Sequence, residues 1–144
     1  MGALYLVVEA GGERIALPAM TVDSVVEGVA VVRVPLAARH VAGLAALRSR
    51  VLTMIDVAAA TGVEGLRESD KQSTVIIPID GQLYGLLVEA VDDVVEVEGD
   101  IEPLRGGVAA GWAAASLGMI EIEGRATLVV DPGALVAGPI ARAA

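Results

Sequence analysis

The sequence predicts a mostly β protein built from two small β-barrels packed side by side. Short runs of valine, leucine and isoleucine alternate with glycine, proline and aspartate turns along the 144 residues. Hydrophobic residues make up 55% of the chain but aromatic residues only 2%, so the core must be built from small aliphatic side chains. Such side chains suit narrow barrels, and barrel closure leaves few unpaired strand edges. The pattern of the first half also restarts in the second half.

In the first half, a glycine turn at residues 10–13 separates two short strands, and further extended segments follow. The most distinctive stretch runs from Pro35 to Asp56 and reads as a hairpin with the basic turn Arg48-Ser49-Arg50. An alanine-rich helix then ends at Gly62. The predicted strands of this half are 4–9, 14–17, 21–27, 29–34, 41–47 and, after the basic turn, 51–56.

The second half repeats this order after a polar connector, EGLRESDKQS, at residues 64–73. Strands are predicted at 74–79, 83–88 and 91–97, and a helix at 132–138. The prediction is one domain over residues 1–144, made of barrel subdomains at about 1–66 and about 73–138.

The two halves read as copies of one another. In a valine-rich chain, many valines match one another by chance. The glycines and aspartates also match and keep their order, which favours an internal duplication. The matching pairs are Gly12 with Gly81, Leu17 with Leu86, Val22 with Val91, Asp23 with Asp92, Val25 with Val94, Gly43 with Gly118, Arg50 with Arg125 and Asp56 with Asp131.

Charge and composition exclude several classes of function. A net charge of −9 argues against a general nucleic-acid binder, which needs basic residues to neutralise phosphates. The chain has no cysteine, which excludes disulfides, thiolate metal sites and cysteine nucleophiles. The longest charge-free run, residues 106–120, is too short for a membrane span, and the first residues lack the basic start of a signal peptide. The expected location is the cytoplasm.

The acidic charge is concentrated in the second half. Residues 1–72 hold seven basic and eight acidic side chains, whereas residues 73–144 hold three and eleven. Glu96, Glu98, Asp100 and Glu102 alternate along one extended segment, but the spacing lacks the glycine and the final glutamate of a calcium loop. This segment reads either as a charged strand edge that resists pairing or as a surface for a basic partner.

We predict no catalytic residue, cofactor or metal. Asp56 and Asp131 each end a strand before a helix, where aspartate serves as an N-cap. His40 has no second ligand nearby in the sequence and reads as a surface or packing residue. Trp112 lies in a glycine- and alanine-rich stretch that we expect to be flexible, where it either caps a barrel end or anchors a partner contact.

Several motifs together resemble the CheW-like family of bacterial chemotaxis coupling proteins, from about Tyr5 to Val136. They are GG-x-x-x-A-L-P from Gly11, V-D-S-V from Val22, R-V-P from Arg33, V-A-G-L-x-x-L-R-x-x-V-x-x-x-I-D from Val41 and G-x-L-Y-G-L-L-V-E-A-V-D-D-V from Gly81. The resemblance implies two five-stranded, SH3-like barrels packed around a hydrophobic interface.

The same resemblance implies a non-enzymatic adaptor. It would couple the cytoplasmic tips of methyl-accepting chemoreceptors to the regulatory domain of the histidine kinase CheA, with other CheW-like domains as further partners. Such a protein would be cytoplasmic and recruited to membrane-associated receptor arrays through its partners, without inserting into the membrane. The residues themselves leave an alternative open, a small-ligand-binding or self-associating barrel without kinase coupling.

The residues expected to meet a receptor or kinase are Ser24, Leu47 and Arg48, with Val22, Val25, Val91 and Val94 along an apolar groove. The guanidinium of Arg48 can grip a carboxylate in bidentate fashion, although an internal salt bridge is the alternative. The four valines could hold a receptor helix, although barrel core is their alternative. The family turn usually reads N-L-R-G, and Ala46-Leu47-Arg48-Ser49 keeps its Leu and Arg. Glutamate often stands in the family at Ser24, and the nearest acids here are Asp23 and Glu27.

Overall fold

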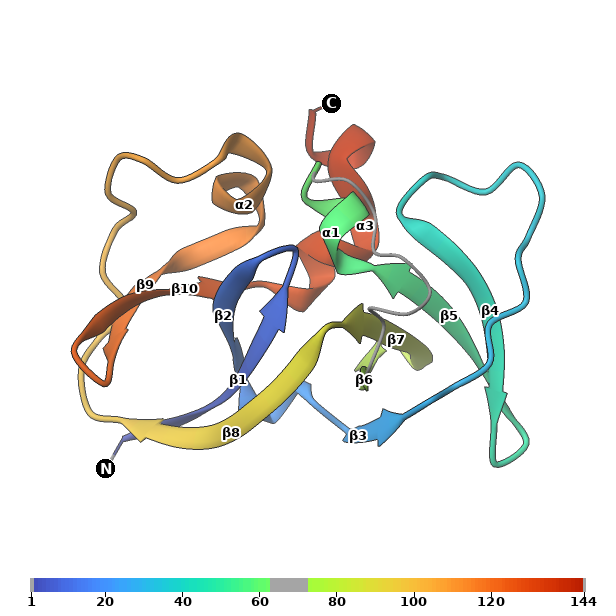
Figure 1. Cartoon of the computed structure of the whole chain (residues 1–144), viewed down its shortest axis with the longest axis horizontal. Helices are drawn as coiled ribbons and strands as arrows, with labels where there is room; N and C mark the ends of the chain where they lie inside the picture. The colour runs from blue at the N-terminus through green and yellow to red at the C-terminus, as the bar shows by residue number, and fades with distance from the viewer. Residues whose placement is uncertain (1, 63–72, 144) are drawn as a thin grey trace.

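The computed structural model describes residues 2–62 and 73–143, and within them ten strands form two five-stranded sheets (Figure 1). Their bounds are β1 Ala3–Ala10, β2 Glu13–Pro18, β3 Ser24–Glu27, β4 Val41–Leu47, β5 Arg50–Asp56, β6 Ser73–Ile79, β7 Gln82–Val88, β8 Ala90–Val97, β9 Ser116–Ile122 and β10 Arg125–Val130. Sheet 1 has the order β8-β1-β2-β10-β9, and sheet 2 has the order β3-β6-β7-β5-β4. The expected mostly β class with two five-stranded sheets is confirmed.

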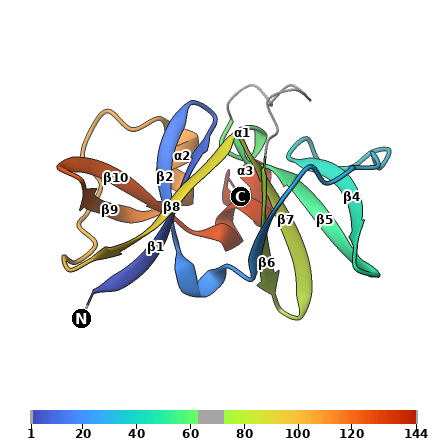
Figure 2. The ribbon, with the colours of Figure 1, turned by 60° about the horizontal axis from the view of Figure 1, so that its bottom comes forward.

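Short helices follow the last strand of each half, as predicted. α1 spans Val57–Ala60 after β5, and α3 spans Pro132–Ala143 after β10. In Figure 2 both lie between sheet 1, on the left, and sheet 2, on the right. A 3-10 turn, η1, at Ala19–Thr21 was not predicted. None of the helices in the described residues is long and apolar enough to cross a membrane.

The predicted assignment of one barrel to residues 1–66 and the other to 73–138 is wrong. β1 and β2 pair with β8 and β10 of the second half, and β6 and β7 pair with β3 and β5 of the first half. Each half therefore gives its first hairpin to the sheet of the other half. The alternation of apolar residues specifies which face of a strand is buried, but it does not specify the partner strand.

The sheets nevertheless repeat one another pair by pair. In sheet 2, Thr53 lies opposite Tyr84 in the parallel pair of β5 and β7. Their counterparts in sheet 1, Leu128 and Ile15, lie opposite each other in the parallel pair of β10 and β2. The same holds for the antiparallel edge pairs, Val25 with Val75 and Val94 with Leu6. An internal duplication accounts for this agreement, because chance similarity would not reproduce the register.

Each sheet is partly closed by the chain that follows its edge strand. Val32, after β3, exchanges two backbone hydrogen bonds of 2.8 Å with Leu44 of β4. Glu102, after β8, does the same with Met119 of β9, again at 2.8 Å. Val32 belongs to the predicted strand 29–34, which forms only this isolated bridge. Complete closure of each sheet into a barrel stays a prediction.

The core has three parts. The alternation of β1 turns Leu6 and Val8 toward a seam between the sheets, and turns Tyr5 and Val7 into a separate core within sheet 1. Sheet 2 has its own core, which includes Leu52 and Met54, two side chains without exposed surface. The hydrophobic interface implied by the resemblance corresponds to the seam, which also receives residues of α1 and α3.

The stretch around Trp112, which we predicted to be flexible, contains the helix α2, Ala110–Ala115. Trp112 is only 2% exposed and packs in the seam core. A Cβ atom at the neighbouring Gly111 would collide with the backbone carbonyl of Thr61, so glycine lets α2 lie against the end of α1. Trp112 therefore stabilises the fold and is not a partner anchor.

Candidate functional site

The turn between β4 and β5 presents Arg48 to solvent. Arg48 and Ser49 have φ angles of 50° and 66°, the double left-handed geometry of a tight hairpin turn. The Arg48 side chain is exposed and forms no ion pair with any residue that the structure describes. The internal salt bridge considered from the sequence is therefore absent from the described residues, and the guanidinium is available to an external carboxylate.

The acidic residues nearest to the family's usual glutamate position are also not paired with Arg48. Ser24 lies half-buried in β3, and its hydroxyl donates a 3.1 Å hydrogen bond to Oδ2 of Asp23. Glu27, at the end of β3, is exposed. Leu47 is half-buried and packs against the core of sheet 2, so it supports the turn from inside.

The four predicted groove valines divide into two pairs. Val22 and Val91 are partly buried and pack against the seam core, so the core interpretation holds for them. Val25 and Val94 are 39% and 51% exposed on the edge strands β3 and β8. The structure thus places one counterpart pair in the core and the other at the surface.

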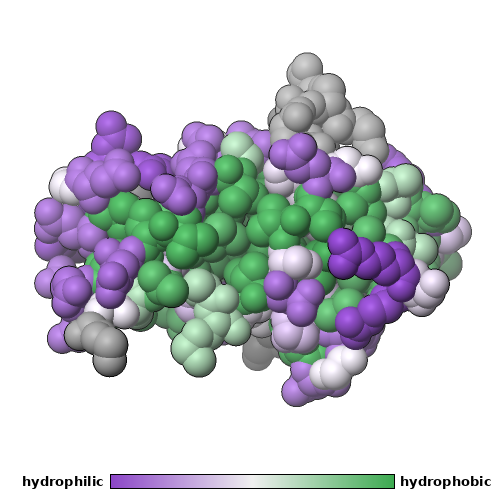
Figure 3. All heavy atoms as spheres, turned by 90° about the horizontal axis from the view of Figure 1, so that it is seen from below, coloured by the Kyte–Doolittle hydropathy of each residue, from purple (hydrophilic) through white to green (hydrophobic). Residues whose placement is uncertain are grey.

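The face seen from below in Figure 1 carries a continuous hydrophobic region in Figure 3, flanked by hydrophilic residues. The elements that lie lowest in Figure 1 are β8, η1, β3 and the start of β1. Their exposed apolar side chains, which we call the underside residues, are Leu4, Met20, Val25 and Val94. The β4–β5 turn with Arg48 points toward the same side in Figure 1. An apolar face with a free arginine near it can bind an amphipathic partner that carries a carboxylate.

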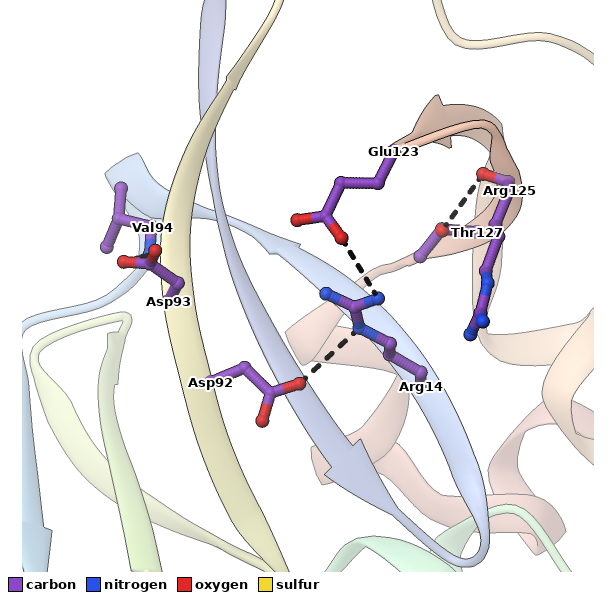
Figure 4. A network of polar contacts seen from close by, with 7 residues as sticks. All are labelled: Arg14, Asp92, Asp93, Val94, Glu123, Arg125 and Thr127. Carbon is purple, nitrogen blue, oxygen red and sulfur yellow. Dashed lines mark hydrogen bonds and ion pairs between the residues drawn. The ribbon is translucent and has the colours of Figure 1, made fainter.

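An ion-pair network in sheet 1 was not found from the sequence (Figure 4). Nε of Arg14 on β2 lies 3.4 Å from Oδ2 of Asp92 on β8, and Nη1 lies 3.9 Å from Oε2 of Glu123 in the β9–β10 turn. The arginine thus ties three segments together. The only signal in the sequence was one basic residue within an otherwise apolar strand, which does not reveal the nonlocal partners.

The residues considered for chemistry have structural roles. Oδ1 of Asp56 accepts a hydrogen bond from the backbone N–H of Ala59, and Oδ1 of Asp131 accepts one from Gly133. Both aspartates therefore cap helices, as predicted. His40 is 8% exposed, and its Nε2 lies 2.9 Å from the carbonyl oxygen of Val136 in α3. In the described part of the chain, no three histidine, aspartate or glutamate side chains gather into a metal site.

A groove of about 560 Å³, also not predicted, lies between β8 and β9 at the edge of sheet 1. The alternating acidic segment noted in the sequence forms one of its walls, and Glu121 and Glu123 belong to the other. The position of the acidic segment along this groove supports the interpretation as a charged strand edge. It is also compatible with the second interpretation, a surface for a basic partner.

Comparison with known proteins gives the same family at three levels. The family model described as a CheW-like domain matches residues 4–139. The chain is 29% identical over 98 residues to a chemotaxis protein CheW of Rhizobium meliloti (strain 1021), a match that covers 67% of this chain and 63% of that protein. The aligned stretch therefore spans less than two thirds of that relative.

A solved structure shares the fold over nearly the whole chain. The scaffolding protein TtCheW from Thermoanaerobacter tengcongensis superposes with a TM-score of 0.80 at 25% identity, covering 91% of this chain and 90% of that one. With the matched family model, the paired half-repeats and the two-sheet fold, the chain belongs to the CheW-like domain family.

Proposed function

We propose that this protein is a non-enzymatic adaptor that couples the cytoplasmic tips of chemoreceptors to the histidine kinase CheA. The observation that carries the proposal is the match to the CheW-like family model across residues 4–139. The relatives named above, a chemotaxis protein and a scaffolding protein, support the same role. In this proposal the protein is cytoplasmic and reaches membrane-attached receptor arrays only through its partners, and its partner on the kinase is the regulatory domain.

The receptor contact would use the underside residues and Arg48. An amphipathic receptor helix would lay its apolar face on Val25 and Val94, the exposed members of the predicted valine set. Arg48 would hold a carboxylate of that helix with its planar pair of N–H donors. Leu47 and Ser24 would position these groups, because both are half-buried beside them in sequence. Val22 and Val91 would act only as support from the core.

Individual contacts of this size are weak. Small interfaces of the transient class bury little surface, and repeated contacts in an array raise the effective affinity. A second CheW-like domain is therefore a reasonable further partner, since it would add such contacts. No chemistry is needed for this role, which agrees with the structural roles of Asp56, Asp131 and His40.

Co-purification tests the adaptor role directly. The full chain, a receptor cytoplasmic fragment and the regulatory domain of the kinase are mixed and separated by size. We expect a ternary complex that forms without any added cofactor. A chain that stays alone and carries a bound small molecule, or that forms only homo-oligomers, would instead support the ligand-binding or self-associating alternative.

Substitution of Arg48 tests the proposed contact. Arg48→Ala is expected to weaken receptor pull-down while leaving the melting temperature nearly unchanged, because Arg48 has no ion pair to lose among the described residues. Arg125→Ala is the matched control, an exposed arginine in the corresponding hairpin of sheet 1. A large fall in melting temperature together with intact receptor binding would assign Arg48 a purely structural role.

A further inference from the structure

The groove at the edge of sheet 1 has an apolar floor and acidic walls. Residues of β8 and β9 alternate, so that one side chain points into the sheet core and the next points out. The floor consists of Val95, Val97, Ile120 and Ile122, which belong to or pack against the core of sheet 1. The walls carry Glu96, Glu98, Asp100, Glu102, Glu121 and Glu123, and the lining includes no lysine or arginine.

The duplicated half shows why this groove is open. In sheet 2, the chain that follows β3 turns Val29 and Val31 inward, where they pack against the core of sheet 2. The counterparts in sheet 1, counted back from the matching bridges at Val32 and Glu102, are Gly99, which has no side chain, and Ile101, which is 40% exposed. Both are exposed. Sheet 2 therefore fills this position with its own side chains, whereas sheet 1 leaves it to solvent or to another molecule.

The backbone at the groove offers an unpaired strand edge. Met119 of β9 uses both its N–H and its C=O on Glu102. Because outward-pointing backbone groups alternate along an antiparallel strand, the N–H and C=O of Glu121 point to the same edge. The bridge at Met119 is the last pairing on this side of β9 within the described residues. An open edge of this kind is a template for an added strand.

Some of the carboxylates already have partners and others do not. Glu102 lies 3.6 Å from Arg105, and Glu123 is held by Arg14. Glu98, Asp100 and Glu121 form no ion pair with any described residue. Like charges that face each other across a groove repel, so a cationic occupant is favoured over a neutral one.

We propose that this groove binds an extended basic segment of a partner protein. The segment would add as a strand beside β9, with apolar side chains on the floor and Lys or Arg side chains facing Glu98, Asp100 and Glu121. The site lies at the sheet 1 end of the molecule, away from the β4–β5 turn that carries Arg48 (Figure 1). It is independent of the receptor contact proposed above, and neither depends on the other.

A peptide titration tests the proposal. The probe is a short synthetic peptide that alternates valine and lysine, followed by fluorescence anisotropy against the full chain. We expect saturable binding that weakens as salt is added. The double variant Glu98→Lys with Glu121→Lys should lose at least roughly tenfold in affinity. The matched control is Asp23→Lys with Glu27→Lys, which makes the same charge change at exposed positions beside and on β3 and should bind as well as the original chain.

A second variant fills the groove in the way that sheet 2 does. Gly99→Val should weaken peptide binding without lowering the melting temperature, because it supplies the side chain of the sheet 2 counterpart Val29 at a position where an added Cβ meets no atom within 4 Å. Unchanged binding to this variant would overturn the proposal. The same conclusion would follow if the Asp23 and Glu27 control weakened binding equally, if a serine–lysine peptide bound as tightly as the valine–lysine peptide, or if no binding occurred at low salt.

Discussion

Sheet 1 and sheet 2 have equivalent backbone conformations but present different side chains to solvent. The turn of sheet 2 places Arg48 at a φ of 50°, and the corresponding turn of sheet 1 places Glu123 at 52°. The two turns are followed by Arg50 and Arg125, which occupy equivalent register positions opposite Leu47 and Ile122. The same turn geometry therefore carries a positive side chain, Arg48, in sheet 2 and a negative one, Glu123, in sheet 1.

The interiors near these turns differ as well. Arg14 of β2 holds Asp92 and Glu123 in sheet 1, whereas its counterpart in sheet 2 is the buried Leu83 of β7. The open edge of sheet 1 is acidic, and that of sheet 2 is filled by valines. The comparison shows that the backbone requirements are common to both halves, while the exposed side chains give each sheet its own surface. Two different partners can then be served by one duplicated fold.

The largest expected effect comes from the two bulge glycines. Gly43 and Gly118 have φ angles of 150° and 139°, and a Cβ atom on either would collide with the carbonyl of Val32 or Glu102. Gly43→Ala and Gly118→Ala should each lower the free energy of unfolding by about 3 kcal/mol, measured by urea denaturation. Gly99→Ala, in open space, is the control. Tolerance of alanine at one glycine but not at the other would break the equivalence of the sheets.

The two capping aspartates should come next. Asp56→Ala and Asp131→Ala each remove a hydrogen bond to the first turn of a helix, at a cost of about 1 kcal/mol in thermal or urea unfolding. The loss should be at least as large for Asp56, which is only 7% exposed. Asp100→Ala, an exposed position, serves as the control. A larger loss at Asp131 than at Asp56 would contradict this order.

Replacing Arg14 by the residue of sheet 2 tests the difference between the interiors. Arg14→Leu leaves Asp92 and Glu123 without their cation, and it should lower the free energy of unfolding by about 1 kcal/mol, since both carboxylates are partly exposed. The difference from the original chain should shrink as salt is added, because salt screens the pair. An effect that is independent of salt would mean that Arg14 acts through packing alone. Arg125→Leu is the control.

The smallest effect on stability is expected at the tips of the hairpins. Arg48→Glu gives the turn of sheet 2 the charge of its counterpart and should change the free energy of unfolding by no more than about 0.5 kcal/mol. Glu123→Arg should cost more, because Glu123 has a contact with Arg14 to lose. Calorimetry of the two single variants gives this order. Equal effects would mean that the two tips are equivalent in energy as well as in geometry.

Local features of the sequence predicted much of the fold. Glycine at residues 11–12, Asp80-Gly81 and the Arg48-Ser49 pair marked turns where φ is positive. Short runs rich in valine and leucine marked β1 and β8, and the aspartates before α1 and α3 marked the starts of these helices. The helix around Trp112 was missed because its glycine disfavours helix and its alanines form no apolar periodicity, and its stability comes from burial of the indole in the seam core.

Candidate site residues were predicted less completely. Arg48 was singled out because it is a basic side chain in a hairpin turn that matches the family motif, and its role in partner binding stays a prediction. Val22 and Val25 differ by three positions and look alike in the sequence, yet one packs inward and the other is 39% exposed. The acidic segment at Glu98 and Asp100 was noticed, but the groove was not, because its second wall is contributed by β9.

The sequence by itself determined the strands, the turns and the duplication, since each depends on residues close together in the chain or on matching positions within it. Only the tertiary structure decided that each half lends its first hairpin to the sheet of the other half. Strand pairing is a nonlocal choice, and the apolar faces of β1 and β2 resemble those of β6 and β7. The deciding factor is the packing of all strands at once around the seam core, which no single segment encodes.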